Sequence, residues 1–359
     1  MPATLAPDDV IANERERRPG AREPLLVLEP LREFLAGVGL QSPATLGARP
    51  IGEGHSNVTF ELSTGVVLRR PPRGPLPPSA HDVLREARLL RALQRTSVRV
   101  PRVLAVCEDS SVIGAPFYVM ERIEGYVIGA ELPAPLRGLD QRARIAEELI
   151  EALVELHAVD WRAVGLEGFG RPSGYLERQL RRFLGLWEHN RTRELPEVEE
   201  IAAWLQAHMP ASPAATIVHG DYRLGNTIFA PGAPARLAAI LDWEMATIGD
   251  PLADVGYMLS HWHQAGDPLL HFNLQSVTAL PGFPSRRELV ERYEQRSGRH
   301  VDALDWYVVL ALWKAAVFME GNYKRALAGT TDDPYLKSFG EGVVELARRA
   351  LDVIGHGLA

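Results

Sequence analysis

The sequence contains very little cysteine: Cys107 is the one cysteine among 359 residues. A single cysteine excludes internal disulfides and any zinc site built from several cysteines, and it is typical of a protein of the reducing cytosol. Cys107 follows the apolar run 103–106, which predicts a buried, structural thiol. We therefore expect a cytoplasmic protein.

Long hydrophobic runs are also missing. The longest strongly apolar run, Val308–Met319, is interrupted by Lys314 and is too short to cross a bilayer. The first residues are rich in arginine, glutamate and proline, unlike a secretory signal peptide. We expect a soluble protein without a membrane partner.

A surplus of positive charge is absent as well. The chain has 39 Lys and Arg against 46 Asp and Glu, a formal net charge of -7, which argues against a nucleic-acid partner. No Walker A sequence occurs, and this excludes the P-loop class. A hydrophobic fraction of 46% and a length of 359 residues suit an enzyme with two lobes. The sequence gives no indication of the oligomeric state.

Three polar residues stand in a fixed order within one short segment: Asp221, Asn226 and Asp242. The apolar runs 227–229 and 237–241 read as two strands joined by the turn-rich sequence Pro-Gly-Ala-Pro. A hairpin of these strands would bring Asn226, at the start of the first, beside Asp242, at the end of the second.

An amide oxygen next to a carboxylate makes a hard oxygen site that suits Mg²⁺ together with its phosphates. Asp221 stands five residues before Asn226 and suits a base that receives a hydroxyl proton. The alternative is that Asp221 and Asp242 are ordinary turn or cap residues. The agreement of three polar positions with one hairpin argues against it.

The segment also resembles a known family. It reads His219-Gly-Asp221, four residues, Asn226, then Asp-Trp-Glu at 242–244 and Gly-Asp-Pro-x-x-Asp at 249–254. Protein kinases carry H-R-D-x-x-x-x-N and then D-F-G, in the order base, metal ligand, metal ligand. In its H-G-D form, the chain resembles the aminoglycoside phosphotransferase-like family, which are small-molecule kinases, from about residue 46 to about residue 350.

The resemblance implies an α+β, two-lobed protein-kinase-like fold. We expect a disordered arm over 1–24, a small antiparallel-sheet N-lobe over 25–125 that binds the nucleotide, and a larger helical C-lobe over 126–359 with the catalytic loop and the acceptor-binding helices. The implied cofactors are ATP and Mg²⁺, and the implied partner is a small molecule with a hydroxyl group that accepts the γ-phosphoryl group.

The resemblance also assigns roles in the C-lobe. Asp221 is the expected catalytic residue, and Asn226 and Asp242 are the expected metal ligands. His219 and Asp254 are expected to support the loop, His219 by packing beneath it and Asp254 by accepting backbone hydrogen bonds.

In the N-lobe, a glycine-rich turn over 52–57 would place backbone N–H groups over an anion. Arg69 stands where kinases have lysine, and Glu86, in a predicted helix over 79–94, is its expected partner. The alternative is that Arg69 and Arg70 are a solvated basic pair at a strand end. The residues expected to bind the nucleotide are Gly52, Gly54, Ser56, Asn57, Arg69, Glu86, Met120, Glu121 and Ile123, the last two through the main chain of a hinge.

The acceptor is a separate question. From Gly256 to the end of the chain, eleven Lys and Arg face twelve Asp and Glu, so the acidic surplus expected for polycationic acceptors is missing. The stretches 67–72, 81–86 and 113–120 resemble kinase-like domains fused to acyl-CoA dehydrogenases, which implies a hydroxyacyl-CoA acceptor. Lys324 and Arg325 are candidate cations for such a ligand, and the equal alternative is that they form a solvated helix end.

Three alternatives stay open. One is an aminoglycoside-type antibiotic kinase. Another is a nucleotide-binding pseudokinase. It is favoured by two departures from the kinase pattern: Arg69 in place of lysine, and Asn57 in place of the third glycine of the G-x-G-x-x-G loop. The third is a metal-dependent phosphohydrolase with Asp221 as nucleophile, although the Rossmann-like first strand of that class is missing near the N-terminus.

The remaining histidines favour structural roles. His157 falls on the apolar stripe of a predicted helix, which indicates a hydrogen-bonded core residue. His261 and His263 flank a tryptophan and cannot share one helix face as metal ligands.

Overall fold

The computed structural model describes residues 6, 8–20, 22–40, 43–51, 57–74, 81–268, 276–329 and 335–358, with only the backbone of Tyr335. The chain divides into two compact units, Met1–Glu124 and Gly125–Ala359, here the N-terminal and the C-terminal unit. Each is described by itself.

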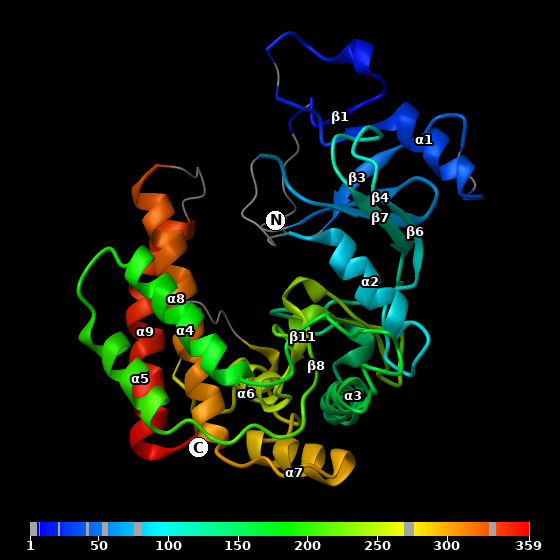
Figure 1. Ribbon diagram of the computed structural model, residues 1–359. Helices are drawn as coiled ribbons and strands as arrows, with labels where there is room; N and C mark the ends of the chain where they lie inside the picture. The colour runs from blue at the N-terminus through cyan, green and yellow to red at the C-terminus, as the bar shows by residue number, and fades with distance from the viewer. Residues whose placement is uncertain are drawn as a thin grey trace. The chain divides into compact units, whose positions relative to one another are not determined.

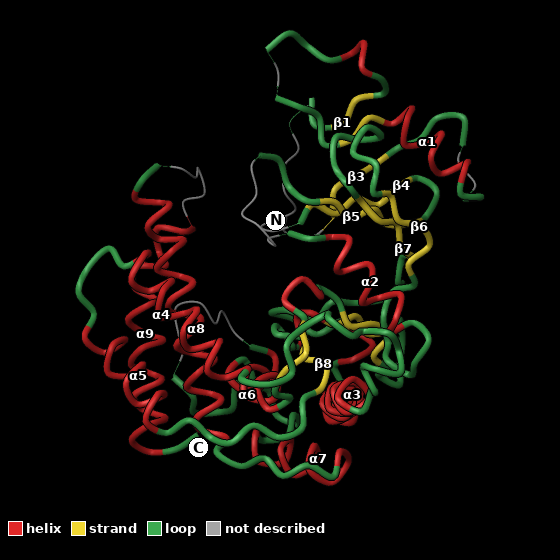
Figure 2. Tube along the Cα trace, in the orientation of Figure 1, coloured by secondary structure: helices red, strands yellow, loops and turns green. Residues whose placement is uncertain are grey.

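The N-terminal unit is built on a five-stranded antiparallel sheet with the strand order β3-β4-β5-β7-β6 (Figures 1 and 2). β4 and β5 form a hairpin whose turn needs Gly65 at a φ of 79°, a conformation that glycine adopts at little cost. The strands are β3 (Ala48–Ile51), β4 (Val58–Leu62), β5 (Val66–Arg70), β6 (Val103–Cys107) and β7 (Phe117–Glu121).

The two faces of this sheet pack on different helices. Successive side chains of a strand point to opposite faces. One face packs on α1 (Leu28–Gly37) in an apolar core that includes the buried Cys107. The other carries Arg69 toward α2 (Val83–Leu93), whose N-cap Asp82 accepts a hydrogen bond from the N–H of Arg85 at 2.9 Å. Fully buried members of the core are Leu31, Leu35, Phe60, Leu68 and Phe117.

Residues 8–20 are more ordered than their composition predicts. β1 (Val10–Ile11) pairs in parallel with β2 (Leu26–Val27), and the carboxylate of Asp9 lies 2.6 Å from the guanidinium of Arg73. A disordered arm over residues 1–24 is therefore wrong for residues 8–20. The partners lie well along the chain, so the local composition did not show them.

The C-terminal unit is mainly helical. Helix α8 packs against α4, α5, α6 and α9, and α7 packs against α3; Figure 1 shows α4, α8 and α9 side by side. The helices are α3 (Leu139–His157), α4 (Tyr175–Asn190), α5 (Pro196–Ala207), α6 (Leu252–Ser260), α7 (Arg286–Ser297), α8 (Leu304–Leu327) and α9 (Tyr335–His356). Short 3-10 helices occur at Glu14–Glu16, Ala134–Leu136, Leu224–Asn226, Trp243–Met245 and Val277–Ala279.

Two small antiparallel sheets lie between α5 and α6 in the sequence. β9 (Thr227–Phe229) pairs with β10 (Leu237–Ile240), so the hairpin predicted from the sequence is confirmed. β8 (Thr216–Val218) pairs with β11 (Thr247–Gly249), a strand that the sequence did not predict. Together the two sheets bring the segment that follows β8 next to the end of β10 and the start of α6.

Across the described part of the chain, we find no helix that combines the length and the apolarity needed to cross a membrane.

Candidate active site

The β9–β10 hairpin places Asn226 beside Asp242. Thr227 is paired with Ile240, and the N–H of Leu241 donates to the carbonyl oxygen of Asn226 at 2.8 Å. Asn226 thus precedes one strand at the level where Asp242 follows the other. The Nδ2 group of Asn226 donates to the carboxylate Oδ2 of Asp221 at 2.7 Å and to its carbonyl oxygen at 2.8 Å. The amide oxygen of Asn226 consequently faces away from Asp221 and suits a cation.

Asp221 has one carboxylate oxygen engaged and one left over. Oδ2 accepts the bond from Asn226. Oδ1 is buried and accepts no hydrogen bond from the residues that the structure describes, although the Nε of Arg223 lies 3.5 Å from it. A buried oxygen in this state is the place where an incoming hydroxyl group would find its acceptor.

Asp242 has an unusual backbone conformation, with φ 63° and ψ 64°. Aspartate tolerates the left-handed region better than most residues, and such conformations gather at functional sites. The next residue, Trp243, holds the turn, because its side chain is buried and its Nε1 donates to the carbonyl oxygen of Ile240 at 2.9 Å. The turn at Asp242 is therefore fixed by its own neighbours.

His219 links the segments that carry Asp221 and Asp242. Its Nδ1 accepts from the N–H of Asp221 at 3.2 Å, and its Nε2 donates to the carbonyl oxygen of Leu241 at 2.8 Å. These two bonds require the neutral tautomer with the proton on Nε2. The ring is fully buried. Its contacts agree with the supporting role expected from the sequence.

Asp254, in the first turn of α6, holds the backbone of the same loop. Its Oδ2 accepts from the N–H of His219 at 2.7 Å and its Oδ1 from the N–H of Gly220 at 2.8 Å. Both are backbone hydrogen bonds of the kind expected for Asp254 from the family resemblance. Gly220 is required, because its φ is 87° and a Cβ there would lie 2.9 Å from the carbonyl oxygen of Met245.

Asp254 is in turn contacted by His157, which is bonded to Tyr293. The Nε2 of His157 lies 3.3 Å from Oδ2 of Asp254, and its Nδ1 lies 2.8 Å from the hydroxyl of Tyr293. Burial raises the pKa of Tyr293, so the hydroxyl keeps its proton and donates to the ring. His157 is a hydrogen-bonded core residue, as the sequence predicted. It also orients the carboxylate that holds the loop.

Two residues lie close to Asp221 at α6: Tyr257, which the sequence did not single out, and His261, directly after the helix, for which it favoured a structural role. Burial, followed by the charge of Asp221, raises the pKa of Tyr257. Burial lowers the pKa of His261, whose Nδ1 lies 3.0 Å from the carbonyl oxygen of Tyr257. Residues 254, 257 and 261 follow helical spacing. That spacing, counted from Asp254, would have revealed the stripe.

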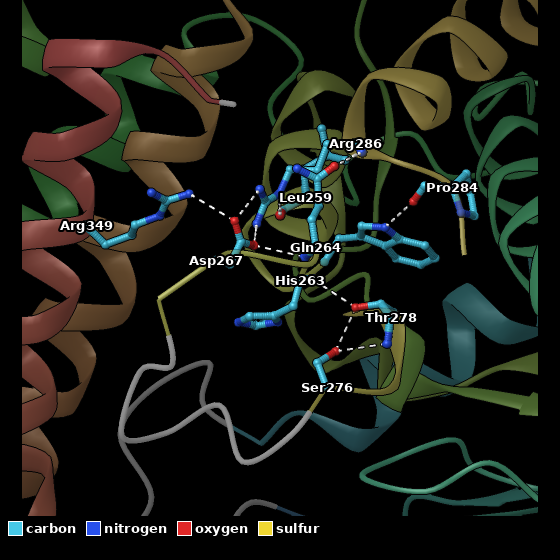
Figure 3. Close-up of polar contacts among 10 residues, drawn as sticks. Leu259, His263, Gln264, Asp267, Ser276, Thr278, Pro284, Arg286 and Arg349 are labelled. Atoms are coloured by element: carbon cyan, nitrogen blue, oxygen red, sulfur yellow. Dashed lines mark hydrogen bonds and ion pairs between the residues drawn. The ribbon is translucent and has the colours of Figure 1, made fainter. Parts of the chain in front are cut away.

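The segment after α6 is fastened by a cluster of charged groups (Figure 3). Arg286 at the start of α7 and Arg349 on α9 both point to Asp267, with Arg286 Nη1 at 3.1 Å and Arg349 Nη2 at 3.8 Å. Asp267 also accepts from the N–H of Gln264 at 3.0 Å. The N–H of His263 donates to the hydroxyl of Thr278 at 2.9 Å. These bonds fix the end of α6, and with it the position of His261.

Asn226 and Asp242 together fit a magnesium ion. They offer an amide oxygen and a carboxylate, and Mg²⁺ is usually held by one or two carboxylates together with substrate phosphates rather than by a protein cage. In the described ranges, no group of three or more His, Cys, Asp or Glu is arranged to hold a metal. The donor set therefore suits an ion that arrives with a nucleotide.

In the N-terminal unit, the structure brings Arg69 and Glu86 together. The Nε of Arg69 donates to Oε2 of Glu86 at 3.0 Å, and its Nη1 donates to the hydroxyl of Thr59 at 3.3 Å. The side chains are 13% and 3% exposed. A buried, hydrogen-bonded pair of this kind holds the guanidinium in one orientation.

Arg70 is not part of a solvated pair. Its guanidinium is buried and donates to the carbonyl oxygens of Pro71 at 3.0 Å, Ile113 at 3.0 Å and Leu25. Burial, and then the charge of Arg73, lowers the pKa of Arg70 to about 10. The alternative of a solvated basic pair at the strand end is therefore wrong for both arginines.

The structure describes some of the other residues that were expected to bind the nucleotide. Gly52, Gly54 and Ser56 lie outside the described residues, and the buried Asn57 directly precedes β4. Met120 and Ile123 are half-buried at the end of β7 and just after it. The N–H of Glu121 donates to the carbonyl oxygen of Arg102 at 2.9 Å and so is already engaged.

These observations define a class of protein. An antiparallel sheet with a buried Arg–Glu pair, a helical unit, and a loop and hairpin that present aspartate, asparagine and aspartate in kinase order make a protein-kinase-like fold. The fold class expected from the sequence, α+β with a small sheet unit and a larger helical unit, is confirmed.

The chain belongs to the Phosphotransferase enzyme family, which it matches over residues 47–307. A solved structure from Ralstonia eutropha JMP134, provisionally named an aminoglycoside phosphotransferase, is 32% identical with a TM-score of 0.78 and covers 90% of this chain and 97% of its own. The family resemblance seen in the sequence is thereby confirmed.

Two further comparisons extend this result. The mouse protein Acyl-CoA dehydrogenase family member 10 is 34% identical over 93% of this chain, which spans only 32% of the length of that relative. A thermostable mutant of aminoglycoside phosphotransferase APH(4)-Ia, solved with AMP-PNP and hygromycin B, is 16% identical with a TM-score of 0.58, over 89% of this chain and 98% of its own. At that identity the likeness concerns the fold alone.

Proposed function

We propose that this protein is an ATP- and Mg²⁺-dependent kinase that transfers the γ-phosphoryl group to a hydroxyl of a small molecule. The observation that carries the proposal is the arrangement around Asp221. Its Oδ2 is fixed by Asn226 at 2.7 Å, and its Oδ1 is buried without a hydrogen bond from the described residues. A carboxylate fixed in this way, with one oxygen that accepts no hydrogen bond from the described residues, can receive the proton of an acceptor hydroxyl.

The other residues take roles that follow from their contacts. Bound Mg²⁺ would neutralise charge that develops on the transferring phosphoryl group. Asn226 and Asp242 would hold the ion through the amide oxygen and the carboxylate. Arg69, oriented by Glu86 at 3.0 Å, would hold phosphate oxygens through its planar guanidinium. Asp254 and His219 would keep Asp221 in place through the backbone of its loop.

The nucleotide part of the proposal is tested without knowing the acceptor. Isothermal titration of the protein with ATP and with GTP, each with and without Mg²⁺, should show binding that needs the ion. At about a hundred times the dissociation constant, a ligand that binds only the folded state adds roughly 2.7 kcal/mol of stability. Binding that is equally strong after chelation of Mg²⁺ would contradict the assigned roles of Asn226 and Asp242.

For the acceptor we propose a hydroxyacyl-CoA. Support comes from the similarity to a relative whose name refers to acyl-CoA dehydrogenases. The cations first expected to contact such a ligand behave differently from one another. Lys324 donates to the carbonyl oxygen of His189 and so closes α8 onto the end of α4, whereas Arg325 is exposed. Lys324 is thus part of the scaffold, and only Arg325 stays a candidate at this end of α8.

A panel of acceptors tests this choice. It contains hydroxyacyl-CoA esters and aminoglycosides, each scored by acceptor-dependent release of ADP and by mass spectrometry of the phosphorylated product. We expect turnover of the CoA esters. Preferential turnover of aminoglycosides would favour the antibiotic-kinase alternative, which the name of the Ralstonia protein supports. Nucleotide binding without transfer to any acceptor and without slow hydrolysis of ATP would favour a pseudokinase.

A further inference from the structure

Two positively charged residues stand where α4 and α8 pack together: Lys314 on α8 and the exposed Arg182 on α4. Lys314 on α8 lies with its Nζ 4.9 Å from the centre of the Phe183 ring, and the ring of Trp313 lies 6.3 Å from the same phenylalanine. Arg182, the residue before Phe183, is close enough for its charge to act on Lys314. The two helices run beside each other in Figure 1.

Neither cation has an acidic partner. In the described ranges, Lys314 and Arg182 have no carboxylate at ion-pair distance and make no hydrogen bond through their side chains. Other arginines of the same unit are paired, as in Arg286–Asp267, Arg292–Glu147 and Arg296–Glu151. Lys314 is moreover half-buried. Two like charges side by side, one of them partly desolvated, are unfavourable until an anion joins them.

Lys314 also lies on the side of α8 that packs on α6. Tyr307, two turns earlier on α8, donates to Asp250 at 2.8 Å, and a Cβ at Gly256 of α6 would lie 2.5 Å from the Cβ of Tyr307. Residues seven apart share one helix face. Burial, and then the charge of Arg182, lowers the pKa of Lys314 to about 8, while the charges of Asp254 and Asp221 act in the opposite direction.

We propose that Lys314, assisted by Arg182, binds a negatively charged oxygen of the acceptor, so that the acceptor is an anion. This inference rests on the proposed kinase function and narrows its acceptor class. An oxyanion at Lys314 removes the repulsion between the two cations and neutralises a half-buried charge. A polycation would be repelled at the same place, so the subsite works against aminoglycosides.

Lysine is rare in this chain, which sets Lys314 apart from the many arginines. Of 39 Lys and Arg residues, only three are lysines: Lys314, Lys324 and Lys337. Lys324 is bonded to a backbone carbonyl and Lys337 is exposed. A compact ammonium makes a point contact with a single oxyanion, which the bulkier guanidinium does not reproduce. The small number of lysines also makes the site easy to follow chemically.

The negative charge can come from a carboxylate near the hydroxyl or from the phosphates of CoA, and matched acceptors separate these sources. One pair is hydroxybutanoate and its methyl ester; the other is hydroxybutyryl-CoA and hydroxybutyryl-pantetheine, which lacks the charged phosphates. Each compound is assayed with the wild type, Lys314→Met, Lys314→Arg and the surface control Lys337→Met.

We expect the wild type to prefer the charged member of one pair by about tenfold to a hundredfold in kcat/KM, as for one charge-assisted hydrogen bond. Lys314→Met should lose this preference mainly through KM and leave the uncharged member unchanged. Lys314→Arg should keep part of it, and Lys337→Met all of it. The proposal is overturned if the wild type does not distinguish the members of either pair, or if Lys314→Met slows both members alike.

A second measurement does not depend on turnover. Acetic anhydride acetylates the three lysines, and peptide mass spectrometry gives a separate rate for each. The charged compounds should slow acetylation of Lys314 more than their uncharged counterparts do, and should leave Lys337 unchanged. If no compound is phosphorylated but this protection is seen, the proposed transfer fails while the anion subsite stands. Equal protection by charged and uncharged compounds, or none, overturns the subsite.

Discussion

Replacing Asp254 by asparagine keeps the shape of the side chain but removes one of its two acceptor oxygens. The wild-type carboxylate accepts from the N–H groups of His219 at 2.7 Å and Gly220 at 2.8 Å, and its side chain is fully buried. In Asp254→Asn, one of these N–H groups would face an amide NH₂ group instead of an oxygen. Oδ2 also faces the Nε2 of His157, so we expect the amide to keep its oxygen there and to turn its NH₂ group toward Gly220. The variant therefore leaves one buried donor without an acceptor and removes the charge from the bonds that remain.

The size of the effect follows from these two losses. A hydrogen bond to a charged group is worth about 1.5–3 kcal/mol, and a buried polar group left unsatisfied costs about 1–3 kcal/mol. Because the two terms overlap in part, we expect the free energy of unfolding to fall by about 3 kcal/mol. For a unit of this size, about 2–4 °C of Tm correspond to each kcal/mol, so Tm should fall by about 6–12 °C.

Differential scanning calorimetry measures this change, with Asp352→Asn on the exposed surface of α9 as a matched control. Because the loop carries Asp221, kcat should fall as well, even at temperatures where the variant is fully folded. Nucleotide affinity should change little, since Asp254 is assigned no nucleotide contact. A Tm equal to that of Asp352→Asn, together with unchanged kcat, would refute the assignment of Asp254 as the residue that holds the loop.

Three other changes test separate parts of the molecule. Asp221→Asn cannot take a proton, so kcat should fall by about 10² to 10⁴ with nearly unchanged Mg-ATP affinity, and the roles are misassigned if binding is lost here but kept in Asp242→Asn. Arg69→Ala should weaken nucleotide binding in calorimetric titration, whereas Arg49→Ala, at an exposed side chain of the same sheet, should not; equal affinities would remove Arg69 from the nucleotide site. Burial lowers the pKa of Lys314 to about 8 in the folded protein, from the ordinary lysine value of 10.5. The unfolded chain therefore binds more protons between these two values, and wild-type stability should rise with pH there. Lys314→Met should therefore have the higher Tm near pH 7 and lose that advantage by about pH 10, and a Tm difference independent of pH would contradict a depressed pKa.

Much of the active-site geometry followed from local sequence. Two apolar runs and a proline–glycine turn are enough to define the β9–β10 hairpin, and its register alone sets Asn226 beside Asp242. The pairing of Arg69 with Glu86 came from the family resemblance and not from periodicity. Helix α7 begins with a capping box of Ser285 and Glu288, a start signal that is local in the sequence.

What the sequence did not predict depends on contacts between distant parts of the chain. The imidazole of His157 reaches Asp254 and Tyr293 across 97 and 136 positions, and no periodicity encodes such a meeting. Strand β11 escaped prediction because its three residues are too short for an alternating pattern. For Arg70 the sequence offered only the alternative of a solvated basic pair with Arg69, whereas backbone carbonyls from distant segments bind its buried guanidinium.

The grip of Asp254 on the catalytic loop has a consequence for local motion. Loops that carry active-site residues usually belong to the part of a protein that opens most easily. Here the backbone N–H groups of His219 and Gly220 donate hydrogen bonds to the carboxylate of Asp254 on α6. This carboxylate is itself bonded to His157 of α3. These amides can exchange with solvent only when the loop separates from α6. Hydrogen exchange at His219 and Gly220 should therefore be as slow as in the core of the helical unit.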